Sequence, residues 1–183
     1  MAKIAPGWAN YAILCGYSYL MRTAVSQHQV DQLDRAIVTR LQVDGRIANI
    51  DLADAVSLSP SACLRRVKAL ESSGIIAGYR AEVARAKAGL GLTVFIELRV
   101  EGHSQETSAR IEQALTSIPA VVACYVVSGT ADFFVEVAVP DLPSYEQLLI
   151  GEILTIPSII GARSSFAIRT VLSRGPLPLE HWH

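Results

Sequence analysis

Three basic side chains lie close together in the stretch SPSACLRRVKALESSGIIAGY, residues 59–79. A helix that begins with small residues can enter a DNA major groove, which is about 12 Å wide, and Arg or Lys can then contact guanine edges or phosphates. This pattern predicts a DNA-contacting helix, although a solvated helix face in a three-helix domain has the same spacing. The candidate contact residues are Ser59, Ser61, Ala62, Arg65, Arg66 and Lys68.

The helix that carries these charges has clear start and stop signals. Ser59 is a favourable N-cap, and Pro60 stands at the first helical position, where its missing N–H costs nothing. Gly74 supplies a left-handed C-cap, so the helix extends to about Ser73. The side chains predicted to face the core are Cys63, Leu64, Val67 and Leu70.

Two further helices precede it. Residues 32–44 carry apolar side chains at helical spacing, with acids near the first turn and Gly45 after the last. A second helix, capped by Asn49 or Asp51, follows with Leu52, Ala53 and Val56 on its inner face. Ser57 and Leu58 form a tight turn into the third helix, so the pair of helices is typical of a helix-turn-helix.

The second half of the chain changes its hydrophobic period. Strands are predicted at 92–100, 121–129, 133–140 and 159–173, with helices at 104–119 and 142–157. This βαββαβ order predicts a four-stranded antiparallel sheet with both helices on one face. Residues 94–99 place apolar side chains on both faces of the first strand, so a partner sheet is expected against the other face. The fold class is therefore α+β.

Composition is that of a globular protein, with 51% hydrophobic and 18% charged residues in a chain of 183. The formal net charge of −1 argues against nonspecific coating of nucleic acid. Residues 30–90 hold nine basic and seven acidic side chains, net +2, whereas residues 91–183 hold five and ten, net −5. That asymmetry favours a DNA-binding module joined to a second module of another kind.

Neither a disulfide framework nor a zinc site is indicated by the cysteines and histidines, which are scattered along the chain. Cys63 and Cys124 are interpreted as small buried hydrophobic residues. The apolar segment from Trp8 to Met21 is shorter than the roughly 20 residues that cross a bilayer, and it lacks a clear cleavage site. Residues 1–28 are expected to be an N-terminal extension, with Met21 as an alternative start.

The quoted stretch, the preceding LDRAIVTRLQVDGR, and the later VSG, Asp132 and VPD together resemble the leucine-responsive and asparagine-responsive (Lrp/AsnC) transcription regulators, from Val30 to about Arg174. The resemblance implies a winged helix-turn-helix joined to a ferredoxin-like domain that senses a ligand and oligomerises. It also implies a cytoplasmic, nucleoid-associated homodimer that forms tetramers or octamers, binds double-stranded DNA, needs no cofactor and responds to an amino acid or related metabolite. The expected domains are 1–28, 29–80, a hinge strand or linker at 81–91, 92–174 and a tail at 175–183.

The resemblance places effector binding at the turn formed by Gly129, Thr130, Ala131 and Asp132. Family members commonly carry an acid and then an aromatic after this glycine, but here Thr130 and Ala131 precede Asp132. An ionised acceptor for an ammonium group is therefore missing at the usual place. Asp132 either supplies that charge or stabilises the turn through its own backbone.

Two other functions fit parts of the sequence. Some haem-precursor decarboxylases resemble this two-domain architecture, and His103 is the histidine that acid–base chemistry would use. The second alternative is an assembly module without DNA binding, against which the basic residues of the third helix argue. Regulation of transcription, without catalysis, is the function that the sequence favours.

Overall fold

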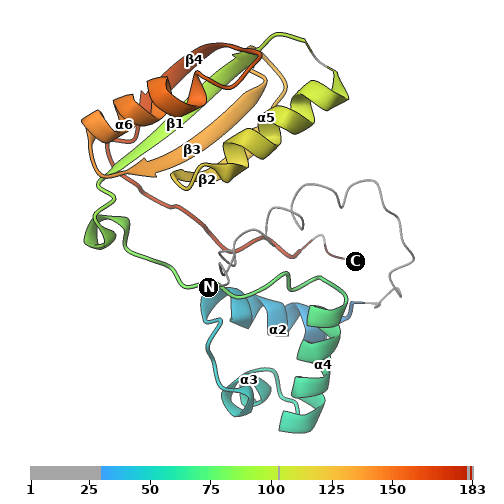
Figure 1. The fold of residues 1–183 in the computed structure, drawn as a ribbon. Coiled ribbons are helices and arrows are strands. Elements are labelled where there is room, and N and C mark those ends of the chain that lie inside the picture. Colours follow the sequence, from blue (N-terminus) through green and yellow to red (C-terminus); the bar gives the residue numbers. More distant parts are fainter. Residues whose placement is uncertain (1–29, 103, 181, 183) are drawn as a thin grey trace, which may run out of the picture. The chain divides into compact units, whose positions relative to one another are not determined.

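A computed structural model describes residues 30–102, 104–180 and 182 (Figure 1). The described chain forms two compact units. One, called here the helical unit, contains the residues up to Glu82 and also those from Leu172 onward. The other, the sheet unit, is Val83–Val171. The expectations for residues 1–28 and for His103 lie outside the described residues.

The described residues of the helical unit form the three predicted helices, α2 (Gln32–Val43), α3 (Asn49–Ala55) and α4 (Pro60–Ser72). Their inner faces meet in a small apolar core because each helix repeats its apolar side chains every three or four residues. The core residues are Ile37, Leu52, Ala53, Val56, Cys63 and Leu70.

Local signals fix the ends of these helices, with one exception. Asp31 caps α2 in a reciprocal capping box with Asp34, and the Ser59 hydroxyl accepts the Ala62 N–H at the start of α4. The predicted cap of α3 is wrong, because the N-cap residue is Ala48 and makes no side-chain hydrogen bond. Asn49 instead donates from Nδ2 to the Pro60 carbonyl oxygen at 2.9 Å, which holds the start of α3 against the start of α4.

The sheet unit has the predicted βαββαβ order. Its elements are β1 (Leu92–Val100), α5 (Gln105–Ser117), β2 (Val121–Val126), β3 (Phe133–Val139), α6 (Leu142–Leu148) and β4 (Ile159–Phe166). The four strands form an antiparallel sheet in the order β2-β3-β1-β4. The ferredoxin-like arrangement predicted from the sequence is confirmed.

Both helices cover one face of this sheet (Figure 1). Ile111 and Leu115 of α5, with Tyr145 and Leu148 of α6, join one apolar core with alternate residues of β1 and β3. On the opposite face, the rings of Phe95 and Phe134 stack with centroids 5.7 Å apart and remain partly exposed. The prediction that both faces carry apolar groups is confirmed.

Several boundaries differ from the prediction, and the strand expected over 121–129 ends at Val126. The helix expected over 142–157 is α6 followed by a single π-helical turn, η2 (Leu149–Ile153). The strand expected over 159–173 ends at Phe166, because the side chains beyond it, such as the fully exposed Ile168, find nothing to pack against. Within 81–91 the structure has no strand but a short 3-10 helix, η1 (Arg85–Ala88), where Arg85 contacts Glu136 at 2.7 Å.

Candidate nucleic-acid interface and effector turn

A stripe of four exposed side chains runs along α4. Ser61, Leu64, Arg65 and Lys68 are spaced i, i+3, i+4 and i+7, so they lie on one face of the helix. We call this the α4 stripe. It combines a small residue at the helix start with two cations further along, which is the arrangement that major-groove recognition needs.

Leu64 was expected in the core, and that prediction is wrong. Its side chain is 44% exposed, whereas Cys63 and Leu70 are fully buried. The helix turns by about 100° per residue, so the inner stripe is centred on Cys63, Val67 and Leu70, and Leu64 falls at its outer margin. An exposed leucine beside Arg65 offers an apolar contact for a thymine methyl group. The sequence signal for this role is its i+3 spacing from Ser61.

Arg66, a predicted DNA contact, lies away from the α4 stripe. Its Nη1 atom is 2.8 Å from Oδ1 of Asp34 in α2 and 2.8 Å from Oδ2 of Asp31, the N-cap of that helix. The Asp34 side chain is only 1% exposed. These contacts raise the pKa of Arg66, mainly through the hydrogen bond to Asp34. The structure therefore uses this guanidinium to compensate a buried carboxylate and to join α4 to α2.

Two other predicted contact residues lie at the start of α4. The Ser59 hydroxyl accepts the Ala62 N–H at 3.3 Å and lies 3.3 Å from the Ser61 hydroxyl. Ser59 therefore has a capping role, and Ala62 is half-buried beside it. Of the six candidate DNA residues, Ser61, Arg65 and Lys68 are brought together on one exposed face.

The predicted effector turn joins β2 to β3. Gly129 has a φ of 133°, in the region that favours glycine, and Gly129 and Thr130 are exposed. Asp132 is tied to β1, because its Oδ2 atom accepts the Val100 N–H at 2.8 Å and its own N–H donates to the Leu98 carbonyl at 2.9 Å. The carboxylate thus has a structural hydrogen bond that fixes the turn to the neighbouring strand.

Cysteine chemistry and metal binding gain no support in the part of the chain that the structure describes. Cys63 is buried, and burial raises its pKa; burial and the nearby Glu112 raise the pKa of Cys124 to about 11. Both thiols therefore stay protonated at neutral pH, which makes them poor nucleophiles. The described residues contain no cluster of three or more His, Cys, Asp or Glu side chains able to hold a metal ion, and no helix long and apolar enough to span a membrane.

Models of two protein families match the chain. Residues 30–77 match a winged helix-turn-helix DNA-binding domain, and residues 93–177 match the Lrp/AsnC ligand binding domain. Among characterised proteins, the chain is similar to the Bkd operon transcriptional regulator of Pseudomonas aeruginosa, with 34% identity over 82% of this chain and 99% of that protein. It is also similar to the leucine-responsive regulatory protein of Escherichia coli, with 33% identity over 82% of this chain and 92% of that one.

Solved structures give the same result. An AsnC family transcriptional regulator from Agrobacterium tumefaciens is 34% identical, with a TM-score of 0.80 over 84% of this chain and all of that one. A transcriptional regulator from Neisseria meningitidis, solved in complex with L-methionine, is 30% identical, with a TM-score of 0.79 over 83% of this chain and 98% of that one.

Proposed function

Because this chain belongs to the Lrp/AsnC family of DNA-binding transcriptional regulators, we propose that it reads DNA through the α4 stripe and regulates transcription in response to an amino acid. The exposed stripe of Ser61, Leu64, Arg65 and Lys68 is the observation that supports this assignment most directly. Arg65 contacts a base edge, Lys68 contacts a phosphate, and Ser61 allows close approach. Ser59 and Ala62 shape the end of the helix that faces the DNA, and Arg66 holds that helix in place.

We propose a homodimer that presents two copies of α4 to successive major grooves about 34 Å apart. The partly exposed Phe95 and Phe134 on the open face of the sheet support pairing of two sheet units through that face. Further association into tetramers or octamers would bend or wrap DNA. As a DNA-binding regulator the protein works in the cytoplasm at the nucleoid, with residues 29–80 and 92–174 as its two working domains and no catalytic role.

We propose that the effector binds at the turn of Gly129, Thr130, Ala131 and Asp132, through the exposed Thr130 hydroxyl and the main chain. Asp132 positions the turn, because its carboxylate is bonded to Val100. The methionine complex of the Neisseria relative supports an amino acid as the effector class. Binding would shift the assembly equilibrium by the difference in affinity for the two assembly states.

Genome-wide footprinting of bound DNA tests the regulator assignment, and enriched sites upstream of metabolic genes are the expected result. Gel-shift titrations on an enriched site then test the α4 stripe. Arg65→Ala should cost about 1–3 kcal/mol of binding free energy at one operator position. Lys68→Ala should weaken binding to all DNA sequences and make the slope of log K against log salt less steep by about 0.9.

Arg110→Ala provides the matched control, because Arg110 is an exposed arginine of α5 in the sheet unit. It should bind like the wild type. An unchanged salt slope for Lys68→Ala would remove this residue from the interface, and the absence of enriched genomic sites would refute regulation of transcription.

A further inference from the structure

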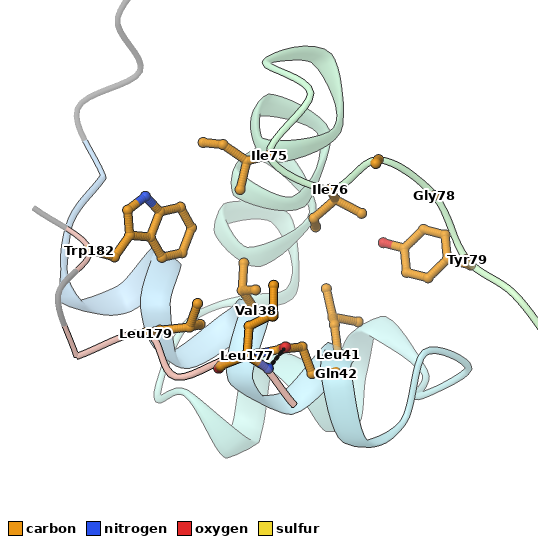
Figure 2. Close-up of a pocket in the computed structure, with 11 residues that line it drawn as sticks. Val38, Leu41, Gln42, Ile75, Ile76, Gly78, Tyr79, Leu177, Leu179 and Trp182 are labelled. Carbon is orange, nitrogen blue, oxygen red and sulfur yellow. Dashed lines mark hydrogen bonds between the residues drawn. The ribbon is translucent and has the colours of Figure 1, made fainter. Parts of the chain in front are cut away.

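The C-terminal tail, residues 175–183, has no helix or strand in its described residues, which belong to the helical unit. Figure 2 shows them along a groove formed by α2 and by the segment that follows α4. The groove encloses about 450 Å³, and the tail forms one of its walls. Its apolar lining comes from Val38, Leu41, Ile75, Ile76, Leu179 and Trp182.

Gln42 holds the main chain of the tail at one residue. Its Oε1 atom accepts the Leu177 N–H at 2.6 Å, and its Nε2 atom donates to the Leu177 carbonyl at 3.3 Å (Figure 2). A side-chain amide that satisfies both main-chain groups of one residue fixes the register of an extended segment. The Leu177 side chain itself is 71% exposed, so this attachment is made by the backbone.

Trp182 makes the second attachment through its ring. It is half-buried and packs against the core of the helical unit, beside the same α2 surface. The main-chain N–H of Trp182 donates to the Leu179 carbonyl at 3.2 Å, so a turn at the end of the tail brings the ring back toward the groove. One polar and one aromatic contact therefore hold the tail against the helical unit.

The course of the chain gives this contact a consequence. The chain leaves the helical unit at Glu82, builds the whole sheet unit, and returns at Leu172. The two units are therefore joined by two chain segments, provided that the tail stays docked. We propose that the surface formed by α2 and the segment after α4 is the docking site of the chain's own C-terminal tail, which acts as a second tether between the sheet unit and the helical unit.

The second tether ends on a helix that also supports α4. Gln42, which holds the tail, and Asp34, which holds Arg66, both belong to α2. A displacement of the tail therefore reaches α4 through one rigid element. Two tethers also restrict how far each DNA-binding unit moves relative to its sheet unit, which raises the effective concentration of the second α4 at its half-site. This consequence rests on the proposed function, whereas tail docking does not.

Trp182 reports docking directly. The chain has two tryptophans, so Trp8→Phe leaves Trp182 as the sole tryptophan emitter. We expect blue-shifted emission and weak acrylamide quenching for this protein. Gln42→Ala should increase quenching about twofold or more as the tail loses its polar attachment, and Gln113→Ala, an exposed glutamine of α5, should not. Equal quenching of Trp182 in the Gln42→Ala variant and its parent would overturn the docking.

A cross-link identifies the chain that supplies the tail. Gln42→Cys and Leu177→Cys are joined with a short bismaleimide in a background where Cys15, Cys63 and Cys124 are replaced by alanine or serine. Peptide mass mapping of the monomer-size band from a denaturing gel should show positions 42 and 177 joined within one chain. A band of dimer size would show exchange of tails between two copies and overturn the intrachain assignment, and so would the absence of any cross-link.

The tethering consequence is tested on DNA with a chain that ends at Arg174. On the enriched two-half-site duplex we expect about tenfold weaker binding with an unchanged salt slope, because the α4 stripe is intact. Equal affinity of the truncated and full chains would overturn the tether. No binding by the full chain to any DNA would instead refute the proposed function and leave the fluorescence and cross-linking results to decide docking.

Discussion

At the scale of single residues, two adjacent arginines of α4 have different roles. Arg65 is exposed on the α4 stripe, whereas Arg66 contacts Asp31 and the buried Asp34. The difference follows from 100° of helix rotation, which places Arg66 next to the inner face. Although they are adjacent in the sequence, Arg65 is available to DNA and Arg66 is required by the fold.

Arg66→Ala should lower the free energy of unfolding by about 3 kcal/mol, because it removes the cation that compensates the charge of the buried Asp34 carboxylate. Arg65→Ala should change it by no more than about 0.5 kcal/mol, since Arg65 is exposed. Urea unfolding followed by circular dichroism measures both values. Equal stabilities of the two variants would contradict the structural role of Arg66.

The Asp31 carboxylate makes the stability of the helical unit depend on pH. The Asp34 N–H that donates to its carboxylate, with help from Arg66, holds the pKa of Asp31 below the ordinary value of 3.8. The folded state then binds this proton less readily than the unfolded state, so the stabilisation is present above pH 3.8 and is lost as the pH falls through the lower, folded value.

Asp31→Asn keeps an N-cap acceptor and removes the charge. The variant should be less stable than the wild type at neutral pH, and the difference should shrink as the solution is acidified below pH 3.8. Thermal unfolding midpoints measured at several pH values test this. A difference that stays constant with pH would show that the Asp31 charge contributes nothing.

At the scale of elements, the ends of α4 are set by residues with special backbone needs. Gly74 has a φ of 75°, and its N–H donates to the Glu71 carbonyl at 3.0 Å. A Cβ at this position would meet nothing within 4 Å, so any cost of substitution is conformational. The position of this glycine therefore determines where the recognition helix ends.

Gly74→Ala should destabilise the helical unit by about 1 kcal/mol, the cost of a left-handed backbone for an L-residue. Gly151→Ala is the matched control, because a Cβ there also meets nothing within 4 Å, but the residue lies in the helical turn η2. Alanine should be neutral or stabilising at that position. Chemical denaturation compares the two, and an equal loss in both would refute the backbone explanation.

The elements themselves were largely predictable from hydrophobic period and caps, because signals such as Ser59-Pro60 and Gly74 are local. The predictions from the sequence failed where contacts between distant residues determine the structure. β4 ends at Phe166 although the β-prone sequence continues, since its pairing with β1 ends at Val94 and Phe166, and beyond it the Ala167 N–H bonds to the Thr93 carbonyl. The pairing of Arg66 with Asp34, and of Gln42 with Leu177, joins residues 32 and 135 positions apart, which no local pattern specifies.

At the scale of the whole molecule, the important surface is the face of the sheet that α5 and α6 leave open. Phe95 of β1 and Phe134 of β3 stack there, facing away from α5 and α6. Partly exposed stacked aromatic rings at the centre of a sheet favour association, because their full burial removes further apolar area from water. A second copy of the same face would cover them by two-fold symmetry.

Phe134→Arg should therefore convert the proposed homodimer to a monomer, because two like charges would meet at the centre of the paired sheets. Sedimentation velocity measures the mass, and the gel shift on a two-half-site duplex should weaken in parallel. Ile150→Arg is the control, since Ile150 is 59% exposed in η2, on the helical side of the sheet unit. A dimer mass for Phe134→Arg would show that the dimer contact lies elsewhere. A different contact would then set the spacing of the two α4 helices.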